Sequence, residues 1–217
     1  MKKVCCVVLV FFISVSMVFA VTASQSKAQK KAESYLKYSS FSYERLVDQL
    51  IFDGYSELDA KYAVDRCGAD WKEQAVKKAN SYLKYSSFSY SGLIDQLEYE
   101  GFTSEQAKYG VEHTALGSSN STSFSQEQAL KKAQSYLKIS GFSRQGLIEQ
   151  LEFEGFTNSD ATYAANNCKA NWNEQAERCA KNYITIMNMS ASELKDQLLF
   201  EGFTSAEASY GVSAVCK

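Results

Sequence analysis

The stretch Leu46-Val-Asp-Gln-Leu-Ile-Phe-Asp-Gly-Tyr-Ser56 decides the fold, because close copies of it begin at Leu93, Leu147 and Leu194. Each copy has the residues of a short amphipathic helix, followed by a glycine, an aromatic residue and a hydroxyl residue. Glycine commonly ends a helix, and serine or threonine can cap the start of the next one. The stretch therefore predicts a helix–tight turn–helix unit that occurs four times.

Each repeat is predicted to hold a third helix, which precedes the quoted stretch. Apolar residues at positions i, i+4, i+7 and i+8 form one face of that helix. In the first repeat they are Ala28, Ala32, Tyr35 and Leu36. Ser42 is placed to cap the second helix and Ser56 to cap the third. The chain has 217 residues and no proline, so glycine must end its helices. The sequence thus predicts an all-α fold of four three-helix repeats.

The spacing of the repeats arranges them in pairs. The first alanines of repeats 1 and 2, Ala28 and Ala75, are 47 residues apart, as are Ala129 and Ala176 in repeats 3 and 4. The interval between Ala75 and Ala129 is longer, at 54 residues. The additional residues form a polar, serine-rich stretch that is typical of a flexible linker.

We therefore expect two domains of two repeats each, residues 24–116 and 125–217, joined by a serine-rich linker at 117–124. A pair of repeats is large enough to bury a core of its own. Trp71 and Trp172 stand at the junction inside each pair, and each is predicted to wedge between its two repeats. A continuous four-repeat solenoid is the alternative arrangement.

Residues 1–23 have the order of a secretory signal peptide. Two lysines precede an apolar run over residues 4–21, and small residues at Ala20 and Ala23 offer cleavage sites. The alternative is an uncleaved membrane anchor, because the run is long enough to span a bilayer. The rest of the chain has no second run of this length. We expect a protein that is secreted or held at the cell surface, with membrane contact only through an uncleaved leader.

Charge and composition exclude several classes of function. The formal net charge is −2, and the leader contains two of the lysines and no acid. A helix-turn-helix protein that binds DNA needs a basic face, so no nucleic-acid partner is expected. The one histidine, His113, has no second ligand beside it in sequence and is placed at a partly exposed helix end. No catalytic arrangement is present. The sequence predicts no enzyme, no metal and no cofactor.

Four cysteines follow the leader, and an exported protein can keep disulfides. Cys179 and Cys216 occur only in repeat 4, where other repeats have different residues. They are the predicted disulfide pair. Cys67 and Cys168 either join across the two domains or remain as core thiols. The alternative for all four is that they are unpaired small hydrophobic residues.

Polar residues repeat along the second helix. A glutamine is present in every repeat, at Gln49, Gln96, Gln150 and Gln197. Its amide is interpreted as bonding turn backbone, with contact to a partner as the alternative. Acids recur beside it, and we expect them to form a solvated face. They are Asp95, Glu98 and Glu100 in repeat 2, and Glu149, Glu152 and Glu154 in repeat 3.

Two rows of aromatic residues flank the repeated glycine, and both are predicted to be mostly core. They are Phe52, Tyr99, Phe153 and Phe200 before it, and Tyr55, Phe102, Phe156 and Phe203 after it. Tyrosines that flank the turn between the first two helices are the candidate partner-binding residues, because tyrosine is favoured at protein interfaces. They are Tyr38, Tyr43, Tyr85 and Tyr90.

The phrase Phe-Ser-x-x-Gly-Leu-Ile-x-Gln-Leu-Glu-Tyr/Phe-Glu-Gly-Phe-Thr, which begins at Phe88 and Phe142, resembles the Ltp family of host-cell surface-exposed lipoproteins. The link Cys67-Gly-Ala-Asp-Trp-Lys-Glu-Gln-Ala75 adds to the likeness. The resemblance covers nearly all of the chain after the leader. It implies a surface protein of Gram-positive bacteria and their prophages with tandem helix-turn-helix-like repeats.

The resemblance also implies a function. The best-known members of the Ltp family exclude superinfecting phage: they block DNA injection by engaging the phage tape-measure protein. We therefore expect a non-enzymatic, exported binding module with a protein partner. The alternative is a cell-envelope protein that binds wall polymer or another surface protein, unrelated to phage. This sequence departs from the family in lacking a lipobox, since neither leader cysteine stands at a cleavage site. It is not expected to be a lipoprotein.

Overall fold

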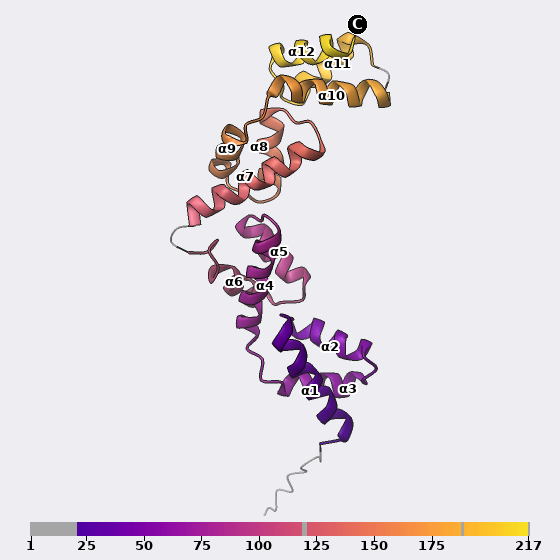
Figure 1. The fold of residues 1–217 in the computed structure, drawn as a ribbon, viewed down its shortest axis with the longest axis vertical. Coiled ribbons are helices and arrows are strands. Elements are labelled where there is room, and N and C mark those ends of the chain that lie inside the picture. Colours follow the sequence, from indigo (N-terminus) through magenta and orange to yellow (C-terminus); the bar gives the residue numbers. More distant parts are fainter. Residues whose placement is uncertain (1–20, 119–120, 188, 217) are drawn as a thin grey trace, which may run out of the picture.

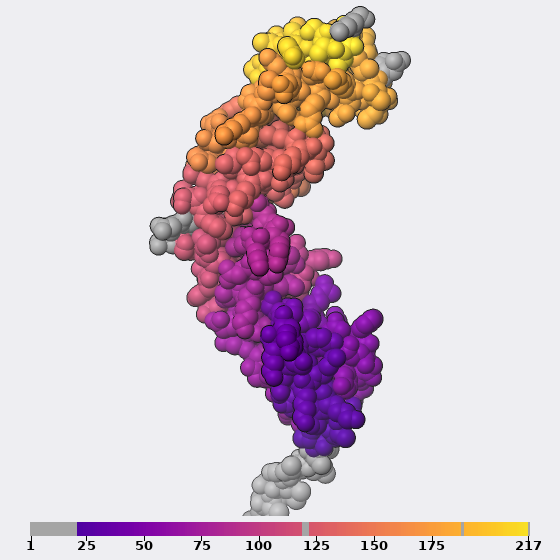
Figure 2. All heavy atoms as spheres, in the orientation of Figure 1, coloured from indigo at the N-terminus to yellow at the C-terminus, as the bar shows by residue number. Residues whose placement is uncertain are grey.

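The computed structural model describes residues 21–118, 121–187 and 189–216, and in these ranges it contains twelve α-helices and no β-strand. Three consecutive helices form each repeat, and the four repeats follow one another along the long axis of the molecule (Figure 1; Figure 2). The predicted all-α fold of four three-helix repeats is confirmed. Residues 1–20 of the predicted signal peptide lie outside the described residues. No described helix has the length and apolarity needed to cross a membrane.

The helices of repeat 1 are α1 (Ala23–Tyr38), α2 (Tyr43–Phe52) and α3 (Glu57–Arg66). Those of repeat 2 are α4 (Trp71–Tyr85), α5 (Tyr90–Tyr99) and α6 (Ser104–Glu112). Those of repeat 3 are α7 (Ser121–Ile139), α8 (Arg144–Phe153) and α9 (Asn158–Asn167). Those of repeat 4 are α10 (Trp172–Met187), α11 (Ala191–Phe200) and α12 (Ser205–Val215).

Hydroxyl residues cap the second and third helices of every repeat, as the sequence predicts. Ser42 accepts a hydrogen bond from the backbone N–H of Arg45 at the start of α2, and Ser56 does the same for Asp59 at the start of α3. At α1, Thr22 accepts from the backbone of Gln25, whose side chain accepts from the Thr22 N–H. These bonds satisfy N–H groups that a helix start leaves unpaired.

Glycine ends the second helix of every repeat in the left-handed backbone region. Gly54, Gly101, Gly155 and Gly202 have φ angles of 94°, 82°, 82° and 85°. A side chain is disfavoured at such angles, which is why glycine recurs there. The predicted glycine caps are confirmed.

Each repeat buries a core of its own. Two leucines of the second helix are fully buried in every repeat, among them Leu147 and Leu151 of α8. They pack with alanines of the first and third helices. In repeat 2 a Cβ on Gly110 of α6 would lie 2.9 Å from the carbonyl carbon of Ala75 in α4. Small residues therefore allow the first and third helices to approach closely, as predicted.

The two tryptophans join neighbouring repeats, which confirms the predicted wedges. Trp71 is the first residue of α4 but packs against the core of repeat 1, where its ring meets Tyr43 edge-on at 5.6 Å. Trp172 of α10 packs against the core of repeat 3. Between repeats 2 and 3 the corresponding contact comes from Phe124 of α7, which packs against the core of repeat 2.

The predicted linker at 117–124 is shorter than expected. Helix α7 begins at Ser121, so residues 121–124 are helical. The reason is that Phe124 gains apolar contacts by extending the helix toward repeat 2. The division into domains 24–116 and 125–217 stays a prediction.

Candidate binding grooves between repeats

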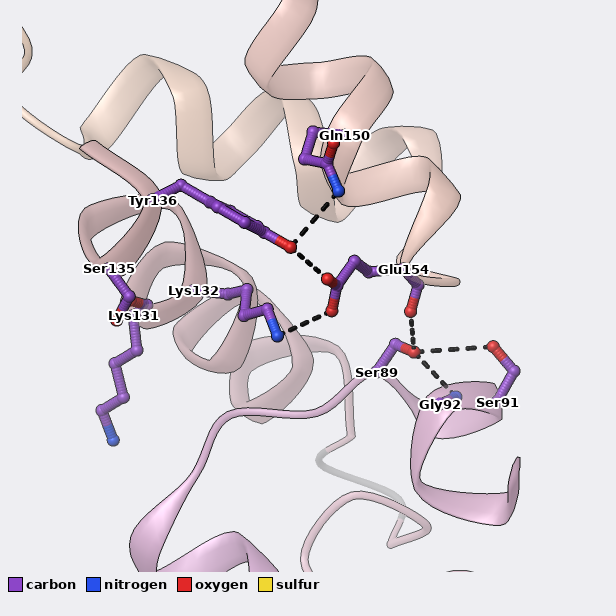
Figure 3. A network of polar contacts seen from close by, with 9 residues as sticks. All are labelled: Ser89, Ser91, Gly92, Lys131, Lys132, Ser135, Tyr136, Gln150 and Glu154. Atoms are coloured by element: carbon purple, nitrogen blue, oxygen red, sulfur yellow. Dashed lines mark hydrogen bonds and ion pairs between the residues drawn. The ribbon is translucent and has the colours of Figure 1, made fainter. Parts of the chain in front are cut away.

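A polar network fixes the first helix of each repeat against the second, and Figure 3 shows its four members in repeat 3. In repeat 3 the Tyr136 hydroxyl donates to Oε1 of Glu154, and the Gln150 amide donates to Tyr136 at 3.3 Å. Lys132 Nζ lies 2.7 Å from Oε2 of Glu154. Burial and the neighbouring carboxylate raise the pKa of Tyr136 to about 12. The network holds a carboxylate at the end of α8 in a half-buried place.

The other repeats contain the same network with small changes. In repeat 2, burial opposes ionisation of Glu100, but hydrogen bonds from Lys78 and Tyr82 hold its pKa below the usual range. Repeat 1 has Asp53 in place of the glutamate, 2.7 Å from the Tyr35 hydroxyl. Repeat 4 has no lysine, because Cys179 stands in its place. Burial, followed by the Glu201 charge, raises the pKa of that thiol to about 12.

This network corrects two predictions. The repeated glutamine bonds a tyrosine hydroxyl rather than turn backbone, because that hydroxyl comes within 3.3 Å of its amide in every repeat. Glu100 and Glu154 do not belong to a solvated face. Each is half-buried, because a lysine and a tyrosine from the first helix neutralise and bond its carboxylate.

The glutamate of the network also joins its repeat to the preceding one. The capping serine of the preceding repeat donates to its backbone oxygen: Ser42 to Glu100 at 2.6 Å, and Ser89 to Glu154 at 2.6 Å. Ser143 donates to the Glu201 oxygen in the same way. All three junctions therefore have one hydrogen bond in common, including the junction between repeats 2 and 3.

The glycine after each glutamate makes room for that serine. A Cβ on Gly155 would lie 2.9 Å from Ser89 Oγ and 2.1 Å from Ser91 Oγ. A Cβ on Gly54, in repeat 1, would meet nothing within 4 Å. The left-handed glycine thus serves the helix end in every repeat and the junction in three of them.

A groove opens beside each of these hydrogen bonds. The groove between repeats 1 and 2 has a volume of about 390 Å³, that between repeats 2 and 3 about 420 Å³, and that between repeats 3 and 4 about 500 Å³. The second helix of one repeat and the end of the second helix of the next line each groove. Phe88, Asp95, Tyr99 and Phe153 are among the residues that line the groove between repeats 2 and 3.

Comparison with known proteins agrees with this repeated architecture. The model of the family Lipoprotein_Ltp, described as host cell surface-exposed lipoprotein, matches residues 24–66, 70–114, 125–168 and 171–215. The chain belongs to the Ltp family. Each of the four matches covers one Ltp repeat.

A solved structure is also similar to this chain. It is that of Ltp, a superinfection exclusion protein from the Streptococcus thermophilus temperate phage TP-J34. The sequences are 36% identical, the match covers 44% of this chain and 99% of that one, and the TM-score is 0.43. The search of curated proteins gave no match.

The aromatic residue before the repeated glycine is exposed in every Ltp repeat, so the prediction that this row belongs to the core is wrong. Phe52, Tyr99, Phe153 and Phe200 are 87%, 75%, 88% and 87% exposed. Each is the last residue of a second helix, two positions after a buried leucine and therefore on the opposite side of that helix. We call these four residues the ring row. The row after the glycine is core as predicted, with Phe102, Phe156 and Phe203 buried and Tyr55 half-buried.

The four tyrosines predicted to bind a partner differ in their surroundings, and their role stays a prediction. Tyr38 and Tyr85 are exposed at the ends of α1 and α4. Tyr43 donates to Asp65 at 2.8 Å, and Tyr90 lies 3.5 Å from Glu112, so each is bonded to the third helix of its own repeat. The ring row was not among the predicted partner-binding residues. The sequence pattern that could have identified it is an apolar residue at a helix position that cannot face the core.

None of the thiols of Cys67, Cys168, Cys179 and Cys216 forms a disulfide in the structure. Cys179 of α10 and Cys216 after α12 belong to the same core cluster. Their disulfide stays a prediction. The described residues contain no group of histidine, cysteine and acidic side chains that could hold a metal ion. His113 caps the end of α6, where its ring stacks on Tyr109 at 3.8 Å.

Proposed function

We propose that this chain is a non-enzymatic binding protein, exported to the cell surface, whose ring row docks a protein partner. The proposal further assigns this docking to phage superinfection exclusion, in which DNA injection by a second phage is blocked. Membership of a family of surface-exposed proteins supports the location. The phage role is what the resemblance to that family implies, with the tape-measure protein as the partner.

The observation that carries the proposal is the exposure of the ring row. Four large aromatic side chains, each at least 75% exposed, recur at one position of the repeat. A single exposed apolar residue is ordinary on a protein surface, but Tyr99 and Phe153 line the same groove, and exposed apolar side chains that gather in one place are typical of an interaction site. Burying one such ring against a partner stabilises a complex by about 1.5–3 kcal/mol.

The experiment compares phage DNA entry in bacteria that express the wild type or a variant with all four rings changed to serine. We expect the wild type to reduce DNA entry without changing adsorption. The variant should lose this effect at equal surface abundance, because it has lost the apolar contacts. Leu58→Ser is the matched control, since Leu58 is 80% exposed and lies outside the grooves.

Two outcomes would contradict the proposal. Normal plaque numbers on cells that display the wild type would remove the phage role. Full exclusion by the four-ring variant would remove the ring row as the docking surface. Capture of the wild type by purified cell walls, with no effect on phage, would favour the alternative of an envelope protein that binds wall polymer.

A further inference from the structure

The groove between repeats 1 and 2 already contains a cation, which the chain itself supplies. Arg45 of α2 donates from Nη2 to the backbone oxygen of Tyr99 at 3.3 Å. The central carbon of its guanidinium lies 5.9 Å from the centre of the Tyr99 ring. Asp48 lines the same groove. An aromatic face, a helix C-terminal carbonyl and a carboxylate all stabilise positive charge.

The other two grooves lack that arginine. The positions that correspond to Arg45 are Gly92 and Gly146, and both line their grooves. Figure 3 shows Gly92 beside Ser89 at the junction of repeats 2 and 3. These two grooves are also larger, at about 420 and 500 Å³ against about 390 Å³ where the arginine is present.

The other two grooves have counterparts of the ring beside Arg45 and of the acid that lines the first groove. Phe153 and Phe200 correspond to Tyr99 and are more exposed than it, at 88% and 87% against 75%. Asp95 and Glu149 correspond to Asp48 and line the two grooves. Within the described part of the chain neither of these two acids forms an ion pair. Glu149 does accept a hydrogen bond from Gln145 at 2.8 Å.

We propose that the grooves between repeats 2 and 3 and between repeats 3 and 4 bind arginine or lysine side chains of a partner polypeptide. A partner cation would take the place that Arg45 takes in the first groove. It would lie over Phe153 or Phe200 and near Asp95 or Glu149. Residues next to the cation in the partner would be apolar, because the exposed rings around the grooves need an apolar surface to be buried.

Charge and apolarity together favour a polypeptide over a wall polymer. A phosphate-containing polymer has few apolar groups to cover the rings, and acids at the grooves repel its phosphates. A basic, amphipathic peptide segment offers both a cation and apolar side chains. Two neighbouring grooves can engage two cations of one segment, so the second contact is made at high effective concentration.

The inference rests on the proposed function, since it names the chemistry of the partner that the ring row docks. The test uses the full chain and a fluorescent, blocked peptide of leucine and arginine with helical spacing. Its counterpart carries citrulline in place of arginine, which keeps the shape of the side chain and removes its charge. Fluorescence anisotropy measures the dissociation constants at low and at physiological salt.

We expect the arginine peptide to bind about tenfold more tightly than the citrulline peptide, with a smaller difference at higher salt. The double variant Phe153→Ala with Phe200→Ala should bind the arginine peptide about tenfold more weakly. A second double variant, Asp95→Asn with Glu149→Gln, should lose the preference for arginine. The control Leu58→Ala should bind like the wild type.

Equal affinity for the two peptides would overturn the inference, as would unchanged binding by the double ring variant. Binding of D-alanylated poly(glycerol phosphate) with no binding of the arginine peptide would also overturn it. Failure of the two proposals can be told apart. Groove-dependent peptide binding without any effect on phage DNA entry removes the phage role alone. If phage exclusion requires the ring row but the arginine and citrulline peptides bind equally well, the cation inference alone is removed.

Discussion

Replacement of Gly155 by alanine should destabilise the protein more than the same change at Gly54. The two glycines have similar left-handed backbones, with φ of 82° and 94°. Alanine in this conformation costs about 1–2 kcal/mol at either site. The two positions differ only in what a methyl group would meet, so Gly54→Ala is a matched control for the backbone term.

The additional cost at Gly155 comes from the junction between repeats 2 and 3. The new methyl would lie 2.1 Å from Ser91 Oγ and 2.9 Å from Ser89 Oγ. Ser91 can rotate away, which ends its hydrogen bond to the Gly155 oxygen. Ser89 is held by the Gly92 N–H that it caps, so the serine–carbonyl bond to Glu154 is strained. Each lost bond costs about 1 kcal/mol. The total for Gly155→Ala is therefore about 3–4 kcal/mol.

The assay is urea unfolding of the wild type and both variants, followed by circular dichroism. The difference in free energy of unfolding between Gly155→Ala and Gly54→Ala should be about 2 kcal/mol. Hydrogen exchange at the Gly92 amide should become faster in Gly155→Ala only. Equal destabilisation by the two substitutions would refute the reasoning, because it would mean that the junction contacts add nothing to the backbone strain.

Three further predictions concern other parts of the chain. Burial and a carboxylate raise the pKa values of Tyr82 and Tyr136 to about 12. The stability that these two networks contribute should therefore be complete below pH 10 and be lost as the pH rises through 12. An absorbance titration in which every tyrosine ionises near pH 10 would count against this. Trp71→Ala should cost about 2–3 kcal/mol, measured by thermal unfolding, because its half-buried ring packs against the core of repeat 1; an unchanged melting temperature would show that the wedge is dispensable. A chain that starts at Ser24 should melt at a lower temperature than one that starts at Val21, because it lacks the Thr22 cap of α1; equal melting temperatures would contradict this.

Local signals in the sequence were sufficient for most helices and their ends, although they did not predict the start of α7 at Ser121. The capping serines and the left-handed glycines depend only on a few neighbouring residues, such as Ser42 with Arg45 or Gly54 after α2. The tryptophan wedges could also be predicted, because Trp71 and Trp172 recur at one position of alternate repeats. These features follow from short-range chemistry and from the repeat itself.

The ring row was predicted to be core because its residues are aromatic, but their position on the helix places them on the surface. Leu50 and Phe52 are both apolar, but two residues further along an α-helix the side chain is rotated by about 200° around the axis and faces the opposite side. Since Leu50 is fully buried, Phe52 must face away from the core, and it is 87% exposed. The helical period could have separated the two rows of aromatic residues.

The polar network and the junctions needed the structure. Gln150 and Tyr136 are 14 residues apart and on different helices, so no local pattern pairs them. Ser89 was predicted as a helix cap, and its hydroxyl oxygen does accept from Gly92. The same hydroxyl still has a proton to donate, and its acceptor, the Glu154 oxygen, is 65 residues away. Sequence alone does not show which backbone oxygen will receive it.

One position, three residues after the capping serine, distinguishes the four repeats at their grooves. Arg45 places a cation over the ring of the next repeat, whereas Gly92 and Gly146 leave the neighbouring rings uncovered. In the last repeat Glu193 turns back to accept from the hydroxyl of Ser190 at 2.7 Å, so the proton that joins repeats elsewhere is used within the helix start. Because the backbone at this position is the same helical turn in each repeat, its side chain distinguishes the groove that contains Arg45 from the two grooves that are lined by a glycine there.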